Sequence, residues 1–358
     1  MNPPTFDALL LLSFGGPEGP DDVLPFLRNV TRGRNVPDER LAVVAEQYAQ
    51  FGGRSPINDQ CRALLSAIEA DLSDAGLDLP IYWGNRNWHP MLTDTVAAMA
   101  DDGIERALVF TTSAFGSYSG CRQYREDLEK ARAAVGPSAP ELVKLRLFYN
   151  HPGFIEPMAA NVADAVAKAN AGAGEATAGD GGATAHRIVF CAHSIPESMA
   201  ASCAYPAQLH EAATLVMAEA GLGDRPFDLV YQSRSGPPHI PWLEPDVNDH
   251  IEALAADGVT SVTLAPIGFV SDHMEVMYDL DTQAVETAEA NGVALNRAAT
   301  VGTAPRFVAM VRELIEERRS AAARLAVGND GPWPDQCPDG HCLAPQRPAA
   351  AGGRPAPA

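Results

Sequence analysis

The chain of 358 residues is 46% hydrophobic and 20% charged, so it is long and apolar enough to form two ordinary globular domains. Its formal net charge of −20 and isoelectric point near 4.7 disfavour nucleic acid and anionic membrane surfaces as partners, because both select for basic patches. The apolar run Ala8–Leu12 is too short for a signal peptide or a membrane span. We therefore expect a cytoplasmic protein without integral membrane association, whose six cysteines are mostly free thiols.

Apolar runs of strand length alternate along the chain with amphipathic stretches of helical period, a pattern typical of parallel sheets with crossover helices. The expected strands are Ala8–Phe14, Pro80–Gly84, Arg106–Thr111, Val143–Leu147, Arg187–Cys191, Phe227–Tyr231, Ser261–Pro266 and Val293–Leu295. The expected helices are Asp38–Phe51, Asp59–Ala75, Met91–Ala100, Tyr118–Val135, Phe154–Ala169, Cys203–Ala220, Val247–Ala256, Asp272–Ala290 and Arg306–Arg324. The fold class is therefore α/β.

Four of these strands fall on each side of a Gly/Ala-rich stretch at residues 171–185, which is either a domain linker or a flexible loop within the second unit. We expect one domain over residues 1–150 and a second over residues 151–325. The last helix could pack on either. Pro, Gly and Ala dominate residues 326–358, which predicts a disordered tail.

Two segments place chemically active side chains just beyond strands. His193 follows one strand, and Asp272, His273 and Glu275 begin the helix after another. Strand ends of this kind line the ligand crevice of an open α/β sheet. An imidazole facing a carboxylate there could hold a divalent metal or transfer protons, although a histidine after a strand is often an ordinary loop or core residue.

The helix that starts near Asp272 carries several acidic residues on one face. Glu275 and Asp279 are four residues apart, and Asp272 lies about one turn earlier. Like charges at this spacing are unfavourable, and a helix N-terminus offsets them only in part. Cation handling and a solvated acidic face both explain the pattern.

Glycine motifs for nucleotide binding are missing. Gly15-Gly16-Pro17 follows the first strand but lacks the GxGxxG spacing, and GxxxxGK[ST] does not occur, so we expect no nucleotide cofactor. Phe14, at the end of that strand, points either into the core or over the crevice, and the sequence alone favours the core.

Three further segments could contact a ligand. Arg54-Ser55 follows two glycines and could bind a carboxylate. Trp83, Arg86 and Trp88 crowd the loop after a strand, where they suit a large planar acidic ligand by stacking and ion pairing, unless the tryptophans belong to the core. Trp242 is a candidate for an apolar wall.

The chain closely resembles ferrochelatase, in particular the actinobacterial, coproporphyrin-using branch. The resemblance runs from about Leu9 to the last helix. It is carried by LLLSFGGPEGPDDVLPFLRNV at the first strand, CAHSIP with His193, YQSRSGP with Arg234, PWLEP with Trp242, and PIGFVSDHMEVMYDLD with Glu275.

This resemblance implies a chelatase fold of two Rossmann-like, doubly wound domains with parallel four-stranded sheets and a porphyrin in the cleft between them. The implied reaction inserts Fe²⁺, a substrate, into coproporphyrin III in haem synthesis, with a downstream haem-synthesis enzyme as a further partner. His193 and Glu275 match the metal site and the catalytic pair. Phe14 matches a residue on the opposite face of the macrocycle, which reverses its core assignment. The matching porphyrin or cleft positions are Ser55, Tyr124, Arg86 and Trp242.

The chain departs from relatives in three places. Thr31 and Gln47 are uncharged where some relatives hold propionates with basic residues, so Arg32 and Arg54 are the expected substitutes. Gln283 replaces another carboxylate on the acidic helix face. A [2Fe-2S] cluster, which some relatives bind, is not expected, because the tail offers only Cys337 and Cys342 and the helix Phe154–Ala169 contains no cysteine.

Other interpretations remain open from sequence. A protoporphyrin IX ferrochelatase would carry the same motifs. A related chelatase that inserts cobalt or nickel would favour several histidines at the metal, and a tetrapyrrole carrier would bind without turnover. The sequence does not decide which of His193 and Glu275 is the base and which is the metal ligand.

Overall fold

The computed structural model describes residues 5–34, 36–172, 186–320 and 322–344, and its strands form two parallel four-stranded sheets. The first sheet has the order β2-β1-β3-β4, and the second has the order β6-β5-β7-β8. The strands are β1 (Ala8–Ser13), β2 (Ile81–Asn85), β3 (Arg106–Thr111), β4 (Glu141–Lys144), β5 (His186–His193), β6 (Phe227–Gln232), β7 (Ser261–Ala265) and β8 (Ala294–Arg297). The identical order confirms the predicted α/β class and shows that the two halves repeat in topology.

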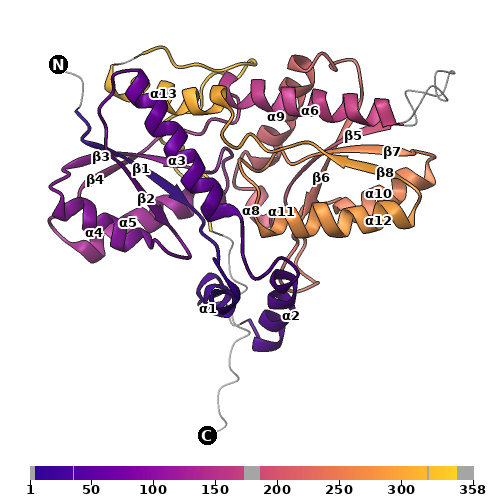
Figure 1. Cartoon of the computed structure of the whole chain (residues 1–358), viewed down its shortest axis with the longest axis horizontal. Helices are drawn as coiled ribbons and strands as arrows, with labels where there is room; N and C mark the ends of the chain where they lie inside the picture. The colour runs from indigo at the N-terminus through magenta and orange to yellow at the C-terminus, as the bar shows by residue number, and fades with distance from the viewer. Residues whose placement is uncertain (1–4, 35, 173–185, 321, 345–358) are drawn as a thin grey trace, which may run out of the picture.

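Both faces of each sheet are covered by helices (Figure 1). The first half contains α1 (Pro20–Val30), α2 (Asp38–Ala49), α3 (Ile57–Asp74), α4 (Leu92–Asp101), the π-helix η1 (Tyr118–Arg122) and α5 (Gln123–Val135). The second contains α6 (Pro152–Gly172), α8 (Glu197–Ala200), α9 (Tyr205–Glu219), α10 (Val247–Ala256), α11 (Met274–Tyr278), the π-helix η3 (Asp279–Gln283), α12 (Ala284–Ala290) and α13 (Pro305–Arg319). In Figure 1, α1 and α2 project from the body below the middle of the molecule, where the two halves meet.

The continuous apolar sequence of β1 follows from its position between two helical layers. Leu9 and Leu11 face the layer that contains α3, whereas Leu10 and Leu12 face α4 and α5, and all four are fully buried. Side chains alternate between the two faces of a strand, so a strand covered on both faces needs apolar residues at every position. The apolar run therefore predicts a central parallel strand, as observed.

A single apolar core joins the two halves. It contains Leu11 of β1 and Phe190 of β5 together with Phe307 of α13, whose ring lies 6.2 Å from that of Phe110 and 5.9 Å from that of Phe148. Helix α13 contacts α3 of the first half and α6 of the second. The last helix thus packs on both halves.

A buried ion pair fastens α13 to the end of the first half. Arg146 and Glu317 have side chains that are 1% and 3% exposed, and their closest nitrogen and oxygen are 2.7 Å apart. Arg146 also donates a hydrogen bond to the carbonyl of Leu325 at 2.7 Å. Removing one partner of such a pair leaves an uncompensated charge in the core.

Several expected element boundaries are corrected by these contacts. The strand expected at Val143–Leu147 is β4, Glu141–Lys144, since Arg146 leaves the sheet to meet Glu317. Helix α13 ends at Arg319, not Arg324. Helix α1, with Pro20 in its first turn and Pro25 inside it, was not predicted.

The prediction of a disordered tail is wrong for residues 326–344, which pack on the body of the protein. The amide of Val327 donates to the carbonyl of Asn150 at 2.8 Å, and the ring of Trp333 lies 6.2 Å from that of Tyr149. Cys342 is 2% exposed, and its amide donates to the carbonyl of Ser202 at 2.7 Å. These partners are distant in sequence, so composition alone could not reveal them.

Residues 345–358 and the predicted loop at 173–185 lie outside the described residues. The domain limits 1–150 and 151–325 stay predictions.

We predict that Glu317→Ala lowers the free energy of unfolding by about 3–5 kcal/mol, because it leaves Arg146 buried and unpaired. Denaturant unfolding followed by circular dichroism measures the change. Glu316→Ala is the matched control, since its side chain is 36% exposed and its ion pair with Arg312 should contribute less than about 1 kcal/mol. Equal losses in the two variants would contradict the assigned role of the buried pair.

Candidate active site

The candidate site lies where the strand order of each sheet reverses. Strands β1 and β3 are neighbours in one sheet and β5 and β7 in the other, although neither pair is consecutive in the chain. Crevices form at the carboxyl ends of strands at such switch points. Phe14 directly follows β1, His193 ends β5, and the segment after β7 leads to Glu275.

His193 and Glu275 face each other, as the two motifs suggested. The Nε2 atom of His193 lies 3.6 Å from an oxygen of Glu275, and their side chains are 34% and 51% exposed. The Nδ1–H of His193 donates to the carbonyl of Ser194 at 2.5 Å. Because a carbonyl can only accept, this bond fixes the proton on Nδ1 and directs Nε2 to the carboxylate.

The two partners stabilise each other's charged form. Burial by itself would lower the pKa of His193, but Glu275 and the Ser194 carbonyl together raise this pKa to about 9. Burial would raise the pKa of Glu275, but His193 and then His273 lower it to about 2. The two side chains therefore form an imidazolium–carboxylate pair at neutral pH.

His273 positions the start of the helix that carries Glu275. The amide of Glu275 donates to Nδ1 of His273 at 3.2 Å, so His273 is the N-cap of α11. Its ring packs edge-on against Phe269, with 4.8 Å between ring centres. Burial, and then the positive charge of His193, lower the pKa of His273, which leaves the neutral ring that an acceptor requires. The sequence alone places this histidine at the start of the helix and indicates no role for it.

Asp279 begins the π-helix η3, one turn beyond Glu275. It accepts a hydrogen bond from the hydroxyl of Ser233, which adopts a left-handed backbone with φ of 59°. Burial is the main cause that raises the pKa of Asp279 to about 7, opposed by Ser233 and supported by the charge of Glu275. Gln232 at the end of β6 donates to the carbonyl of Glu275 at 3.1 Å. The sequence does not predict the contacts of Gln232 and Ser233 with Glu275 and Asp279, because these two pairs are far apart in the chain.

Asp272 does not share the acidic face with Glu275 and Asp279. It precedes α11 and binds Arg297, with a nitrogen–oxygen distance of 3.2 Å, and it accepts from the Thr300 hydroxyl at 3.2 Å. Its expected place in a secondary acidic site is therefore corrected. Asp272 joins the loop before α11 to the end of β8.

Phe14 lies on the surface, so the core assignment is wrong and the exposure implied by the resemblance is observed. Its side chain is 37% exposed, and its ring packs edge-on against Phe26 of α1 at 6.3 Å. Phe26 and Tyr48 belong to an apolar cluster of α1 and α2 that also contains Met274, the residue before Glu275. Burial and the charge of Glu275 raise the pKa of the Tyr48 hydroxyl. Helices α1 and α2 of the first half therefore lie next to the start of the helix that carries Glu275.

Arg86 and Tyr124 form a wall behind Phe14. The guanidinium of Arg86 lies 4.5 Å from the ring centre of Tyr124 and 5.9 Å from that of Phe14. Arg86 also pairs with Asp127 at 2.7 Å, and its side chain is only 6% exposed. This arginine is therefore committed to an internal ion pair and stiffens the wall.

The other expected ligand contacts differ in exposure. Ser55 is only 3% exposed, and its amide donates to the carbonyl of Pro17. Arg54 is half exposed and pairs with Asp59 at 2.5 Å. Arg32 follows α1 on the surface and forms no ion pair with any residue in the described ranges.

Trp242 follows β6 and lies beside the segment after His193. It forms an isolated bridge with Pro196, and the amide of the next residue, Leu243, donates to the carbonyl of Ile195 at 3.0 Å. The indole N–H of Trp242 is buried and meets no acceptor within the part of the chain that the structure describes. A buried donor without a partner is costly and suits a site that a ligand completes.

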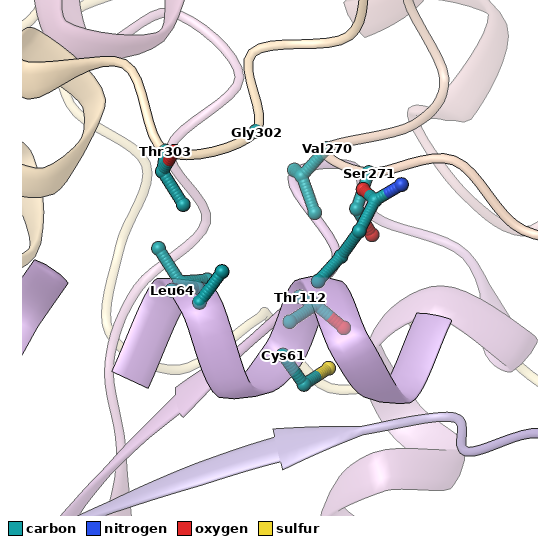
Figure 2. A pocket seen from close by; sticks show the side chains of 9 residues that line it. Cys61, Leu64, Thr112, Val270, Ser271, Gly302 and Thr303 are labelled. Carbon is teal, nitrogen blue, oxygen red and sulfur yellow. The ribbon is translucent and has the colours of Figure 1, made fainter. Parts of the chain in front are cut away.

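A pocket of about 220 Å³ lies between the halves (Figure 2). Cys61 and Leu64 of α3 and Thr112 line one side, whereas Val270, Ser271, Gly302 and Thr303 line the other. It contains neither His193 nor Glu275 and is smaller than the ~300–1,000 Å³ typical of ligand sites. The His193–Glu275 pair therefore lies outside this pocket.

Comparison with solved structures identifies the fold. A sirohydrochlorin chelatase, SirB from Bacillus subtilis subspecies spizizenii in complex with cobalt, superposes with a TM-score of 0.51 at 11% identity, covering 89% of this chain and 97% of that one. At this identity the likeness shows the fold alone. The two sheets of this chain thus form the two-domain α/β fold of chelatases.

Sequence comparison then identifies the family. The ferrochelatase family model matches residues 6–319. The coproporphyrin III ferrochelatase of Frankia alni is 56% identical over 95% of this chain and 87% of its own length. That of Streptomyces griseus is 52% identical over 98% and 97%. The chain belongs to the ferrochelatase family.

We predict that a divalent ion binding at His193 displaces the proton on Nε2, because the pKa of this histidine is raised to about 9. The affinity for Zn²⁺, measured by calorimetry between pH 7.5 and 8.5, should rise about tenfold per pH unit. In this range Asp279, with a pKa of about 7, is already largely ionised. His193→Gln should remove the slope, and His210→Gln, on the exposed face of α9, should keep it. A pH-independent affinity of the unmodified chain would contradict the assignment.

Proposed function

We propose that this protein inserts Fe²⁺ into coproporphyrin III, giving coprohaem, with His193 and Glu275 as the catalytic pair. The relatives named for coproporphyrin III align over nearly the whole chain, which supports this substrate. The single observation that carries the proposal is the 3.6 Å approach of His193 to Glu275 at the switch point of the second sheet.

A site with only two protein ligands suits a metal ion that is transferred to the porphyrin. Within the described residues, no three His, Cys, Asp or Glu side chains are grouped so that they could hold a metal ion. His193 and Glu275 would supply two ligands, and water or the pyrrole nitrogens would supply the others. A resident metal site is usually closed by four protein ligands, whereas a two-residue site releases its ion more readily.

Metal insertion exchanges one Fe²⁺ for two pyrrole protons, so the site must accept protons. While His193 is an imidazolium, it cannot act as a base, and the Glu275 carboxylate is the available acceptor. The incoming cation expels the His193 proton. Asp279, whose pKa of about 7 lies near neutral pH, is then suited to relay protons to solvent.

The walls of the proposed porphyrin site come from both halves. Phe14, supported by Arg86, would face the macrocycle from the first half, and Trp242 would line the second. The unpartnered N–H of Trp242 and the surface guanidinium of Arg32 suit the carboxylates of a tetracarboxylate porphyrin. Helices α1 and α2 contact Met274, the residue before Glu275, and so would form a further side of this site.

Two parts of the proposal concern the cell. A cytoplasmic location and a downstream haem-synthesis enzyme that receives the product remain predictions. No helix in the described ranges is long and apolar enough to cross a membrane.

The substrate is tested by anaerobic Fe²⁺ insertion with coproporphyrin III and protoporphyrin IX in parallel, followed by loss of porphyrin fluorescence. We expect a higher kcat/KM for coproporphyrin III, because its two additional carboxylates offer additional acceptors. A preference for protoporphyrin IX would overturn the substrate assignment. Binding without turnover of either porphyrin would instead support a carrier.

We predict that His193→Ala lowers kcat at least about 100-fold, since it removes a metal ligand and the charged partner that keeps the proton acceptor Glu275 ionised. Glu275→Gln should likewise lower kcat far more than it changes KM. His210→Ala is the matched control and should keep normal turnover. If Glu275→Gln raises KM and spares kcat, Glu275 holds the porphyrin and does not act in the reaction.

A further inference from the structure

The C-terminal segment, residues 322–344, connects the two halves at its far end. The carbonyl of His341 accepts from Arg122 of η1 in the first half at 3.4 Å. The amide of the next residue, Cys342, donates to the carbonyl of Ser202 in the second half at 2.7 Å. The segment therefore lies against both halves close to the wall that carries Tyr124.

Two cysteines meet where this segment crosses η1. Cys121 lies inside the π-helix, and its side chain shares a hydrogen bond with that of Cys337. The indole N–H of Trp333 donates to the sulfur of Cys337 at 3.5 Å, which holds this cysteine in place. Both residues are partly exposed, whereas Cys61, Cys191 and Cys342 are buried. A small oxidant can therefore reach the pair.

We propose that Cys121 and Cys337 are a redox modification site, at which a disulfide covalently joins the C-terminal segment to η1. Arg122, the residue after Cys121, binds the His341 carbonyl, and Trp333 holds Cys337, so the segment that carries Cys337 already lies against η1. Residues 121 and 337 are far apart in the chain, and a bond between them closes a long loop. Such a cross-link restricts the unfolded chain strongly.

The oxidant is a small-molecule disulfide, and the reaction is two successive exchanges. The Cys337 thiolate attacks the disulfide RSSR, forms Cys337–S–S–R and releases one RS⁻. The Cys121 thiolate then attacks the Cys337 sulfur, forms the Cys121–Cys337 bond and releases a second RS⁻. The cysteines lose two protons and two electrons, and RSSR is reduced to two thiols.

The environment decides the order of attack. The hydrogen bond to Cys337, and then burial, raise the pKa of the Cys121 thiol. Cys121 is thus the poorer initial nucleophile and the resolving partner. This assignment does not depend on iron insertion.

The test incubates the full chain with oxidised and reduced glutathione at several ratios, alkylates the remaining thiols, and maps tryptic peptides without reduction. Cys121 lies in the peptide 107–122, and Cys337 shares the peptide 325–358 with Cys342, because both later arginines precede proline. We expect these two peptides to be linked in the monomer. The link should disappear in Cys121→Ser and Cys337→Ser and persist in Cys342→Ser and Cys203→Ser.

Thermal unfolding gives a second readout. Oxidation should raise the melting temperature of the unmodified chain by about 5 °C and leave that of Cys337→Ser unchanged. The proposal is overturned if Cys121 stays alkylated under oxidation, if the link persists in Cys337→Ser, or if it forms only between two chains. An adventitious surface disulfide would also fail to shift the melting temperature.

Discussion

The apolar core that runs between the two sheets is the constraint on which the rest of the structure depends. Leu11 of the first sheet and Phe190 of the second lie in the same cluster, and α13 closes it through Phe307. The buried pair of Arg146 and Glu317 fixes the position of this helix. Because the halves are joined in this way, α1 and α2 of the first half pack against Met274, the residue before Glu275.

Several polar groups of the candidate site contribute little to folding stability or lower it. The pair of His193 and Glu275 is partly exposed and contributes little to folding. Ser233 adopts a left-handed backbone, which is costly for a residue with a side chain, and its hydroxyl binds Asp279. Three groups with shifted pKa values thus lie within two turns of one helix and the end of one strand, which is typical of a site that moves protons or cations.

Much of the fold could be predicted because the signals are local. The apolar run of β1 and the motif around His193 each indicate their structural environment within a few residues. Predictions failed where a distant partner decides the outcome: Asp272 was assigned to an acidic face but binds Arg297, and the C-terminal segment orders against Tyr149 and Ser202. The roles of His273 and Gln232 were missed for the same reason, since capping and support of Glu275 depend on the position of the helix end.

The sequence by itself determined the class of fold, the repeated order of strands and helices, and the two residues that face each other in the site, because periodicity and strand-end motifs are properties of short segments. Only the tertiary structure decided which charged groups are free and which are paired. In the folded chain Arg86 pairs with Asp127 and Asp272 pairs with Arg297. The indole N–H of Trp242 has no acceptor among the described residues. Ionisation and hydrogen bonding depend on burial and on neighbours within a few ångströms, and those neighbours come from parts of the chain that only folding brings together.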